Sequence, residues 1–418
     1  MKKPLLSSPF AWALFFMVLP ALARASEQPS APSRLPPPPK VVPGIVVHHI
    51  PQSSGVFIGS PSLAVLPNGD YVASHDEFGP QSSEFTKAVS HVFRSADRGQ
   101  SWCRIATIHG QFWSTLFVHR GALYLVGTDR HHGNVIIRQS MDGGVTWTSP
   151  TNSVTGLLRD NGEYHCAPVP VIEHQGRLWR AIERRQPPRG WGITYGACMM
   201  SVPSTADLLK ADNWTFSNFL PGNTNWLEGA FNGWLEGNAV VTRNGNVLDI
   251  LRVDTASYPE KAARVNVTPD GKLATFEPAR GFIHFPGGAK KFTIRFDAKS
   301  GQYWSLTTSG LDQPRTTSRP AALRNSLVLT CSSDLTHWTI RRMLLSHPDS
   351  VRHGFQYVDW LFDGDDIIAV CRTAYEDDQG GAHNYHDANF LTFHRWRNFR
   401  NLTLGEEAQP PQNGSNLK

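Results

Sequence analysis

The chain has 418 residues, of which 18% are charged, and a formal net charge of +5 at pH 7. Three basic residues, Lys2, Lys3 and Arg24, lie in the N-terminal leader described below, and without them the net charge falls to +2. A nearly neutral chain without runs of Lys or Arg is not expected to bind nucleic acid. The five Cys are odd in number and include no C-x-x-C pair, which argues against a disulfide scaffold.

The N-terminus has the pattern of a secretory signal. Lys2 and Lys3 precede an apolar run over residues 10–23, and residues 23–25 (Ala-Arg-Ala) have the small-x-small form of a signal peptidase site. We therefore expect residues 1–25 to be a signal peptide and the mature protein to be secreted or periplasmic. The apolar run is too short to span a membrane, so we expect no membrane partner.

The next segment and the C-terminal end lack the pattern of a folded core. Residues 26–44 contain four consecutive Pro and are expected to form a Pro-rich linker. Residues 404–418 are polar and are expected to be a disordered tail. The folded domain is therefore predicted at residues 45–403.

Strand patterns dominate this domain. Short apolar or alternating runs bounded by Gly, Asn, Asp or Pro recur at residues 62–66, 71–74, 89–94, 115–118, 122–127 and 135–139. Runs of this length and alternation are typical of β-strands. Only residues 205–211 have a helical pattern, so we predict an all-β domain.

A sequence repeat gives the architecture. The pattern S-x-D-x-G-x-x-W occurs at residues 95–102 and 140–147, a period of 45 residues, and weaker copies start at Ser332 and Ser204. In such a turn the Asp accepts hydrogen bonds from its own backbone, the Gly takes a positive φ, and the Trp packs back across the hairpin. A period of about 40–50 residues made of strands indicates the blades of a β-propeller.

One hairpin brings two charged groups together. In residues 233–252, Glu236 closes a polar turn over residues 233–235 and is followed by an apolar run, Asn244-Gly245-Asn246, and a second apolar run that ends at Arg252. This pattern predicts strand, tight turn and strand. Glu236 and Arg252 are then expected to lie side by side as an ion pair, in which the Arg keeps the Glu ionised.

The S-x-D-x-G-x-x-W element resembles the Asp box, or BNR repeat, of the sialidase (neuraminidase) superfamily. The resemblance implies a six-bladed β-propeller with its site at one end of the central axis and no cofactor. It also implies three Arg that hold the substrate carboxylate, a Tyr nucleophile activated by a Glu, an Asp acid/base, and hydrolysis with retention.

Two stretches match this catalytic set. Residues 236–252 resemble the family's Glu and second Arg, which assigns these roles to Glu236 and Arg252. Residues 354–364 resemble the segment of the nucleophile, which makes Tyr357 the candidate. A Tyr with a pKa of about 10 needs a carboxylate to take its proton, so Tyr357 is expected beside Glu236.

The third Arg is assigned by its place before a strand. Arg324 precedes the strand that leads into the weak repeat at Ser332, and Arg319 and Arg372 are alternatives.

The sequence departs from the family at the first Arg, where Gly59 stands instead. The acid/base is expected roughly 25 residues further on, at Glu84. His75 or Asp76, at the end of the first strand, are alternatives, and a further alternative is that none of the three is the acid/base.

Further polar and aromatic residues are expected at strand ends. Aromatic rings beside hydrogen-bonding groups are typical of sugar pockets. The expected substrate contacts are Arg252, Arg324, Trp113, His165, Lys291, His353, Arg372 and His383. His131-His132 and the group His383, His386 and Asp387 lack the spacing of a zinc site, so no metal is expected.

These observations favour a monomeric, exo-acting glycoside hydrolase that uses a Tyr/Glu pair on acidic or hydroxyl-rich glycans. A true exo-α-sialidase is an alternative. Similarity to ulvan lyases and related α-L-rhamnosidases gives another, a lyase on uronate-containing polysaccharides that would use Tyr357 with His165, His353 or His383. A glycan-binding propeller without activity is the third.

Overall fold

The computed structural model describes residues 41–255, 259–309 and 319–403, which belong to one compact unit. The signal peptide predicted at residues 1–25, the linker up to residue 40 and the tail at residues 404–418 lie outside the described residues.

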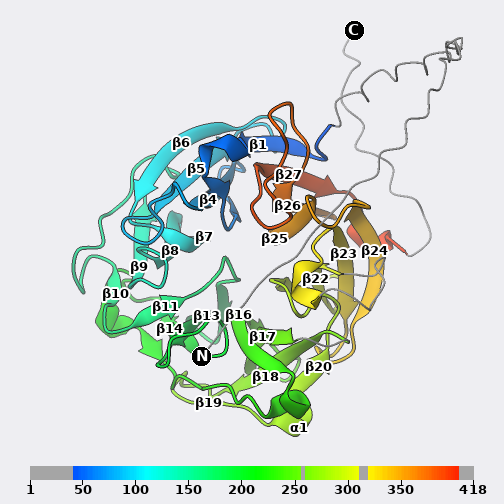
Figure 1. Ribbon diagram of the computed structural model, residues 1–418. Helices are drawn as coiled ribbons and strands as arrows, with labels where there is room; N and C mark the ends of the chain where they lie inside the picture. Colours follow the sequence, from blue (N-terminus) through cyan, green and yellow to red (C-terminus); the bar gives the residue numbers. More distant parts are fainter. Residues whose placement is uncertain (1–40, 256–258, 310–318, 404–418) are drawn as a thin grey trace, which may run out of the picture. The chain divides into compact units, whose positions relative to one another are not determined.

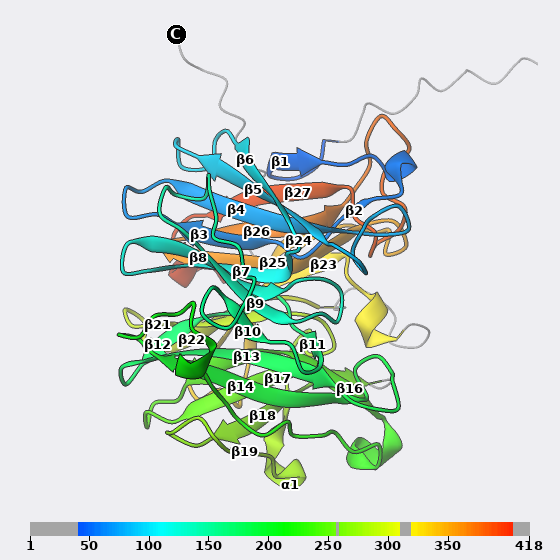
Figure 2. The same cartoon turned by 90° about the vertical axis from the view of Figure 1, so that its left-hand side faces the viewer.

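The described strands form six antiparallel sheets arranged in a ring around a central axis (Figure 1). The view in Figure 2 shows the strands of successive blades running from one face of the ring to the other. This confirms the predicted all-β, six-bladed β-propeller. The six blades follow one another in chain order. In each blade the strand nearest the axis comes first in the sequence, apart from β1 (Ile45–His49), which joins blade 6.

The first three blades cover residues 57–216. Blade 1 contains β2 (Phe57–Ile58), β3 (Ser62–Val65), β4 (Tyr71–Phe78), β5 (Val89–Ser95) and β6 (Cys103–His109). Blade 2 contains β7 (Phe112–His119), β8 (Ala122–Thr128), β9 (Val135–Ser140) and β10 (Leu157–Arg159). Blade 3 contains β11 (Glu163–His165), β12 (Ile172–His174), β13 (Arg177–Arg185), β14 (Tyr195–Pro203) and β15 (Thr215–Phe216).

The other three blades complete the ring. Blade 4 contains β16 (Phe231–Val241), β17 (Val247–Thr255), β18 (Lys261–Val267), β19 (Ala274–Thr275) and β20 (Phe282–His284). Blade 5 contains β21 (Thr293–Asp297), β22 (Gln302–Thr308), β23 (Ser326–Ser332) and β24 (Thr339–Ser346). Blade 6 contains β25 (Gly354–Asp363), β26 (Asp366–Ala374), β27 (Phe390–Trp396) and β1 (Ile45–His49).

The helical segments within the described residues are short. They are α1 (Pro278–Gly281), η1 (Gln52–Ser54), η2 (Ala211–Asn213), η3 (Trp226–Gly229), η4 (Pro320–Ala322) and η5 (Phe399–Asn401). None of the described helices is long and apolar enough to cross a membrane. The helix predicted at residues 205–211 is wrong, because residues 205–210 form turns, one of them closed by a hydrogen bond from Leu209 N to Asp207 Oδ1, and Ala211 begins η2.

The repeated turns have the geometry predicted from their sequence. In the first, Ser101 N donates to Asp97 Oδ1 at 2.9 Å, Gly99 has a φ of 91°, and Trp102 Nε1 donates to Gly99 O at 3.2 Å. In the second, Thr146 N donates to Asp142 Oδ1 at 2.9 Å. These Asp side chains accept hydrogen bonds from the backbone of their own turns, which is the predicted structural role.

The ring is closed by the first described strand. β1 pairs with β27 and becomes the outer strand of blade 6, next to blade 1 (Figure 1). At this joint His48 Nδ1 lies 2.8 Å from His75 Nε2, and the ring of His91 packs against both. Burial and the neighbouring His91 lower the pKa of His48 to about 4. Burial and His48 lower the pKa of His75 well below its usual value.

Acid should therefore loosen this joint. A His with a lowered pKa in the folded state binds its proton more readily in the unfolded chain, so stability is present above about pH 6.5 and is lost as the pH falls toward 4. We expect His48→Gln to reduce this loss, measured as the difference in free energy of unfolding between pH 7 and pH 5, by on the order of 1–2 kcal/mol. His337→Gln, at an exposed ring, is the control. An equal effect of both substitutions would contradict the prediction.

Candidate active site

Three innermost strands share an irregularity near one end of the axis. β7, β16 and β25 each contain a β-bulge. One non-glycine residue in each bulge has a positive φ: Trp113 (49°), Glu236 (58°) and Tyr357 (55°). Such strained residues persist where the surrounding structure holds them, often at functional sites. The polar turn predicted at residues 233–235 is wrong, because these residues are paired with residues 252–254 inside β16, and the bulge at Glu236 follows them.

The bulges of blades 4 and 6 bring a phenol and a carboxylate together. Tyr357 Oη donates to Glu236 Oε1 at 2.8 Å, and Arg252 Nη1 donates to Glu236 Oε2 at 2.9 Å. The hairpin pairs Leu235 with Arg252, so the predicted proximity of Glu236 and Arg252 is confirmed. Burial alone would raise the pKa of Glu236, but Arg252 and then His165 lower it below its usual value. Glu236 is therefore an ionised acceptor.

Tyr357 itself is protonated at rest. Burial and the negative charge of Glu236 raise the pKa of its phenol above the usual value. The hydrogen bond to Glu236 gives that proton a place to go when the oxygen forms a new bond.

Two further guanidinium groups surround the phenol. The Cζ atoms of Arg324 and Arg372 lie 5.7 Å and 5.0 Å from the centre of the Tyr357 ring. With Arg252, they form a cluster of three buried Arg from blades 4, 5 and 6. Arg319, the other alternative, instead forms an ion pair with Asp254 near the surface.

Backbone and amide groups hold the three guanidinium groups in place. Arg252 Nε donates to Ala289 O at 2.8 Å, Arg324 donates to Ala321 O and Gln356 Oε1, and Arg372 donates to His386 O. Each Arg keeps one terminal nitrogen for which the described residues supply no acceptor, Nη2 in Arg252 and Arg324 and Nη1 in Arg372. Rigidly held donors of this kind suit a carboxylate ligand.

Asp76 lies at the same end of the propeller. Its Oδ2 accepts from Trp113 N at 2.7 Å and its Oδ1 accepts from Ser60 N. Burial raises the pKa of Asp76 to about 7, although the two N–H groups and Arg372 act in the opposite direction. Arg372 interacts electrostatically with both Asp76 and Tyr357. Asp76 can therefore exchange a proton near neutral pH.

Gly59 explains how Asp76 fits. A Cβ atom at position 59 would lie 2.2 Å from Asp76 Oδ1 and 2.4 Å from its carbonyl oxygen, so no larger residue can stand there without displacing Asp76. The resemblance places an Arg at this position. Here the space is occupied by the Asp76 carboxylate, and Arg372 from blade 6 approaches it instead.

Trp113 and His165 form a wall beside these groups. Their ring centres are 4.5 Å apart, and His165 stacks on Tyr195. His165 Nδ1 lies 2.7 Å from Glu183 Oε2, while Glu183 Oε1 accepts from Gly237 N at 3.1 Å. Glu183 thus fixes both the imidazole and the bulge that presents Glu236.

The remaining predicted residues are engaged elsewhere. His75 points to the opposite face of β4 from Asp76, into the joint with β1. Glu84 lies behind His131, with 3.3 Å between Oε2 and Nδ1. His353 contacts Asp349 and Glu376.

Two more predicted contacts also have protein partners. His383, more exposed, contacts Asp387 and stacks on Phe57. Lys291 donates to Val358 O and Thr293 Oγ1, each at 2.7 Å, and so supports the bulge at Tyr357.

This chain is similar to known proteins in its structure but not in its sequence. No protein-family model and no curated protein matches the sequence. Among solved structures, an α-L-arabinofuranosidase from Fusarium graminearum has a TM-score of 0.56 at 11% identity, covering 86% of this chain and 99% of that one. A Hadza microbial sialidase has a TM-score of 0.56 at 14% identity, covering 85% and 68%. An α-L-arabinanase from Penicillium chrysogenum, bound to arabinobiose, has a TM-score of 0.53 at 12% identity, covering 86% and 99%.

This chain has the fold of the sialidase-like β-propellers. The three matched proteins are glycoside hydrolases, and at 11–14% identity they establish the architecture of this chain.

Glu183 is the site residue that sequence reasoning missed. In β13 the residues Trp179, Ala181 and Glu183 alternate onto one buried face. A charged residue in phase with apolar positions is a signal of a paired, buried group, and it was available from the sequence.

One group of side chains in this sialidase-like propeller has ligand atoms close enough for a metal ion. Within the described residues, His347, His353 and Glu376 place three such atoms within 4.8 Å of one another. His353 also contacts Asp349 through Nδ1 at 3.1 Å, an arrangement that orients metal-binding His residues in other proteins. That no metal is needed stays a prediction.

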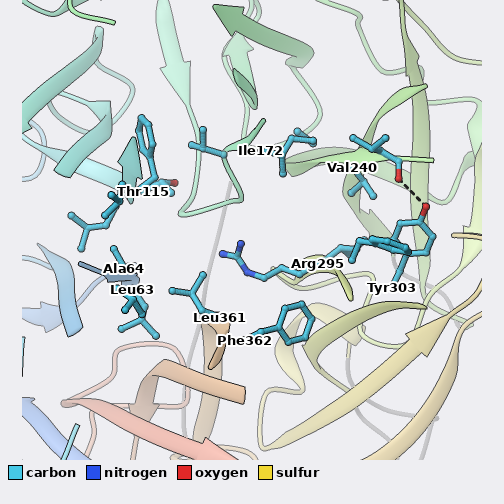
Figure 3. Close-up of a pocket in the computed structure, with 18 of the residues that line it drawn as sticks. Leu63, Ala64, Thr115, Ile172, Val240, Arg295, Tyr303, Leu361 and Phe362 are labelled. Atoms are coloured by element: carbon cyan, nitrogen blue, oxygen red, sulfur yellow. Dashed lines mark hydrogen bonds between the residues drawn. The ribbon is translucent and has the colours of Figure 1, made fainter. Parts of the chain in front are cut away.

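A cavity of about 860 Å³ lies toward the other end of the axis (Figure 3). It is lined mostly by apolar residues of the innermost strands of the six blades, such as Leu63, Ile172, Val240 and Leu361. Arg295 points into it, but Glu236, Tyr357 and Asp76 do not line it. The titratable groups of the candidate active site, Glu236, Tyr357 and Asp76, therefore lie outside this cavity.

A buried ion pair supports the candidate site from blade 4. Lys290 Nζ lies 2.7 Å from Glu260 Oε1, and Ala289 N donates to Glu260 Oε2, which holds the loop whose carbonyl anchors Arg252. We expect Lys290→Met to lower the free energy of unfolding by about 3 kcal/mol, because Glu260 would stay buried without its cation. Chemical denaturation measures this change. Lys299→Met, which breaks an exposed pair with Asp365, should cost less than about 1 kcal/mol, and a similar loss in both would refute the prediction.

Proposed function

We propose that this protein is a sialidase-like glycoside hydrolase that removes a terminal, carboxylate-bearing sugar with retention of configuration. The observation that carries the proposal is the 2.8 Å hydrogen bond between Tyr357 and an ionised Glu236, beneath three buried guanidinium groups. In its favour, the matched propellers are glycoside hydrolases.

The charge of the cluster supports an anionic substrate. Arg252, Arg324 and Arg372 bring three positive charges, and Glu236 contacts only Arg252 among them. A substrate carboxylate would bind the remaining guanidinium nitrogens by charge-assisted hydrogen bonds. Because all three Arg are nearly fully buried, a sugar that reaches them would be enclosed, which favours a terminal residue over one inside a chain.

The proposed reaction has two steps. First, the Tyr357 oxygen attacks the anomeric carbon, its proton passes to Glu236, and Asp76 protonates the departing oxygen. Second, the Asp76 carboxylate takes a proton from water, the water oxygen displaces Tyr357 from the sugar, and Glu236 returns the proton to the phenol. Two displacements at one carbon retain its configuration.

A true exo-α-sialidase is a second candidate. Its weakness in the sequence is Gly59 in place of the first Arg. The approach of Arg372 to both Asp76 and Tyr357 supplies a third guanidinium by another route, which favours this reading.

The test is incubation of the protein with sialosides, uronosides and uronate-containing polysaccharides, with Tyr357→Phe as control. Reducing ends should appear without the absorbance of unsaturated uronate, and the mutant should release none. If both signals rise, the protein is a lyase and the proposal is wrong. Release that persists in Tyr357→Phe would exclude this Tyr as the nucleophile.

A further inference from the structure

A second cavity, of about 420 Å³, lies beside the candidate active site, on loops and strand ends of blades 1, 2 and 3. It is lined by loop and strand-end residues, which are Phe85, Arg130, His131, His132, Gly162, Glu163, Arg185, Arg189, Gly190 and Trp191. Its volume is in the range of small-ligand sites. None of the residues in the proposed reaction lines it, so its binding groups are distinct from those of the axial cluster.

A single aromatic ring connects the cavity to the candidate acid. The Trp113 ring lies 4.6 Å from that of His131, which lines the cavity, and 4.5 Å from that of His165. The backbone N–H of Trp113 donates to Asp76. Trp113 therefore contacts both a residue of the cavity wall and the proposed acid, which places the cavity next to Asp76.

Two exposed aromatic side chains flank the cavity. Trp191 is 48% exposed and Phe85 is 64% exposed, among few large apolar side chains in the described residues that face solvent to this degree. Phe85 stacks on His131 with 4.6 Å between ring centres, and Trp191 lies 5.2 Å from His165. Exposed rings beside polar groups provide flat surfaces for the C–H faces of sugars.

The charges in the cavity are unevenly paired. Arg185 Nε lies 2.9 Å from Glu163 Oε2, and Arg189 Nη2 lies 3.0 Å from the other oxygen of the same carboxylate. One carboxylate thus faces two guanidinium groups, and the side chain of Arg189 is 72% exposed. Arg130 pairs with Asp129 and His131 with Glu84, so the excess positive charge is at Arg185 and Arg189.

His132 adds a neutral hydrogen-bonding wall. Its Nε2 lies 2.7 Å from Tyr195 Oη, and burial together with His165 lowers its pKa to about 2.

We propose that this cavity is a subsite for the leaving-group side of the substrate and takes a sugar that carries an anionic substituent, a carboxylate or a sulfate. The anion binds Arg189 and Arg185, and the sugar ring packs against Trp191. The inference rests on the proposed function for its place in catalysis, while the binding of the anionic sugar stands by itself. The substrate would then carry negative charge on both sides of the cleaved bond.

The test measures binding without turnover, so an absence of hydrolase activity does not affect it. Full-length protein is titrated with glucuronic acid, glucose 6-sulfate and glucose by calorimetry. At least one anionic sugar should bind and glucose should not. Arg189→Ala should weaken that binding about tenfold, because a charge-assisted contact is lost from an exposed position that does not affect folding. Comparison of the two anions identifies the preferred group.

Two further variants locate the binding. Arg324→Ala reports on any anionic sugar bound at the axial cluster, and Arg280→Ala, which removes another highly exposed Arg, is the control and should have no effect. Loss of binding in Arg324→Ala with none in Arg189→Ala would place the anion at the axial cluster and overturn the proposal. Equal binding of glucose and the anionic sugars, or no binding of either anion, would also overturn it.

Discussion

Replacing Tyr357 with Phe should lower kcat on the order of 10³-fold or more, while the fold remains intact. The substitution removes only the oxygen that is hydrogen bonded to Glu236 at 2.8 Å. Without it no covalent intermediate can form, and removal of a nucleophile costs more than the loss of any binding contact. Steady-state kinetics on the substrate found in the screen gives the effect on kcat and KM separately.

The chain offers a matched control for this substitution. Tyr71 is also buried, and its Oη donates to the Asp363 carboxylate at 2.7 Å, at the far end of β4 from Asp76. Tyr71→Phe should lower stability by about 1–2 kcal/mol, as Tyr357→Phe should, but leave kcat unchanged. Equal kcat losses in the two variants would show a structural effect rather than a chemical one.

The catalytic role of Glu236 should depend on the same hydrogen bond to Tyr357. Because Glu236 takes the Tyr357 proton, Glu236→Gln should cost nearly as much as Tyr357→Phe, and the double variant should be little worse than either single variant. Additive losses would mean that the two residues act in separate steps.

Asp76→Asn should lower kcat/KM about 10²–10⁴-fold for substrates with poor leaving groups. A sugar or alkoxide leaving group needs a proton, and Asp76, which interacts with the same Arg372 as Tyr357 does, has a pKa near neutrality. For a 4-nitrophenyl glycoside, whose leaving group is stable as an anion, the first step should be nearly unaffected. Burst kinetics with this substrate would then show rapid release followed by slow turnover.

The pH profile follows from the same pKa. A general acid must be protonated, so kcat/KM for natural substrates should fall as the pH rises through about 7. This limb should disappear in Asp76→Asn. Glu84→Gln is the control, because Glu84 faces His131 rather than the axis. A limb that persists in Asp76→Asn, or one removed by Glu84→Gln, would assign the acid elsewhere.

The sequence alone was sufficient where the causes are local. The repeated Ser-x-Asp turns and the spacing of strands predict the propeller, because each blade contains its own turn signals and alternation. Glu236 and Arg252 are brought together by one hairpin, so their register follows from the number of residues between them. The strand pattern did not reveal the bulge at Glu236, because this bulge is held by a contact with the neighbouring blade, in which Gly237 N donates to Glu183 Oε1.

The other residues of the site come together only when the six blades close into a ring. Tyr357 and Glu236 are 121 residues apart in sequence and meet because blades 4 and 6 face the same axis. Arg372 and Arg319 are equivalent as sequence signals, yet packing turns the first toward Tyr357 and the second toward the surface. Asp76 and His75 are adjacent, and strand alternation with the space left by Gly59 selects which one faces the site. These choices depend on contacts between blades, which no single stretch of the chain contains.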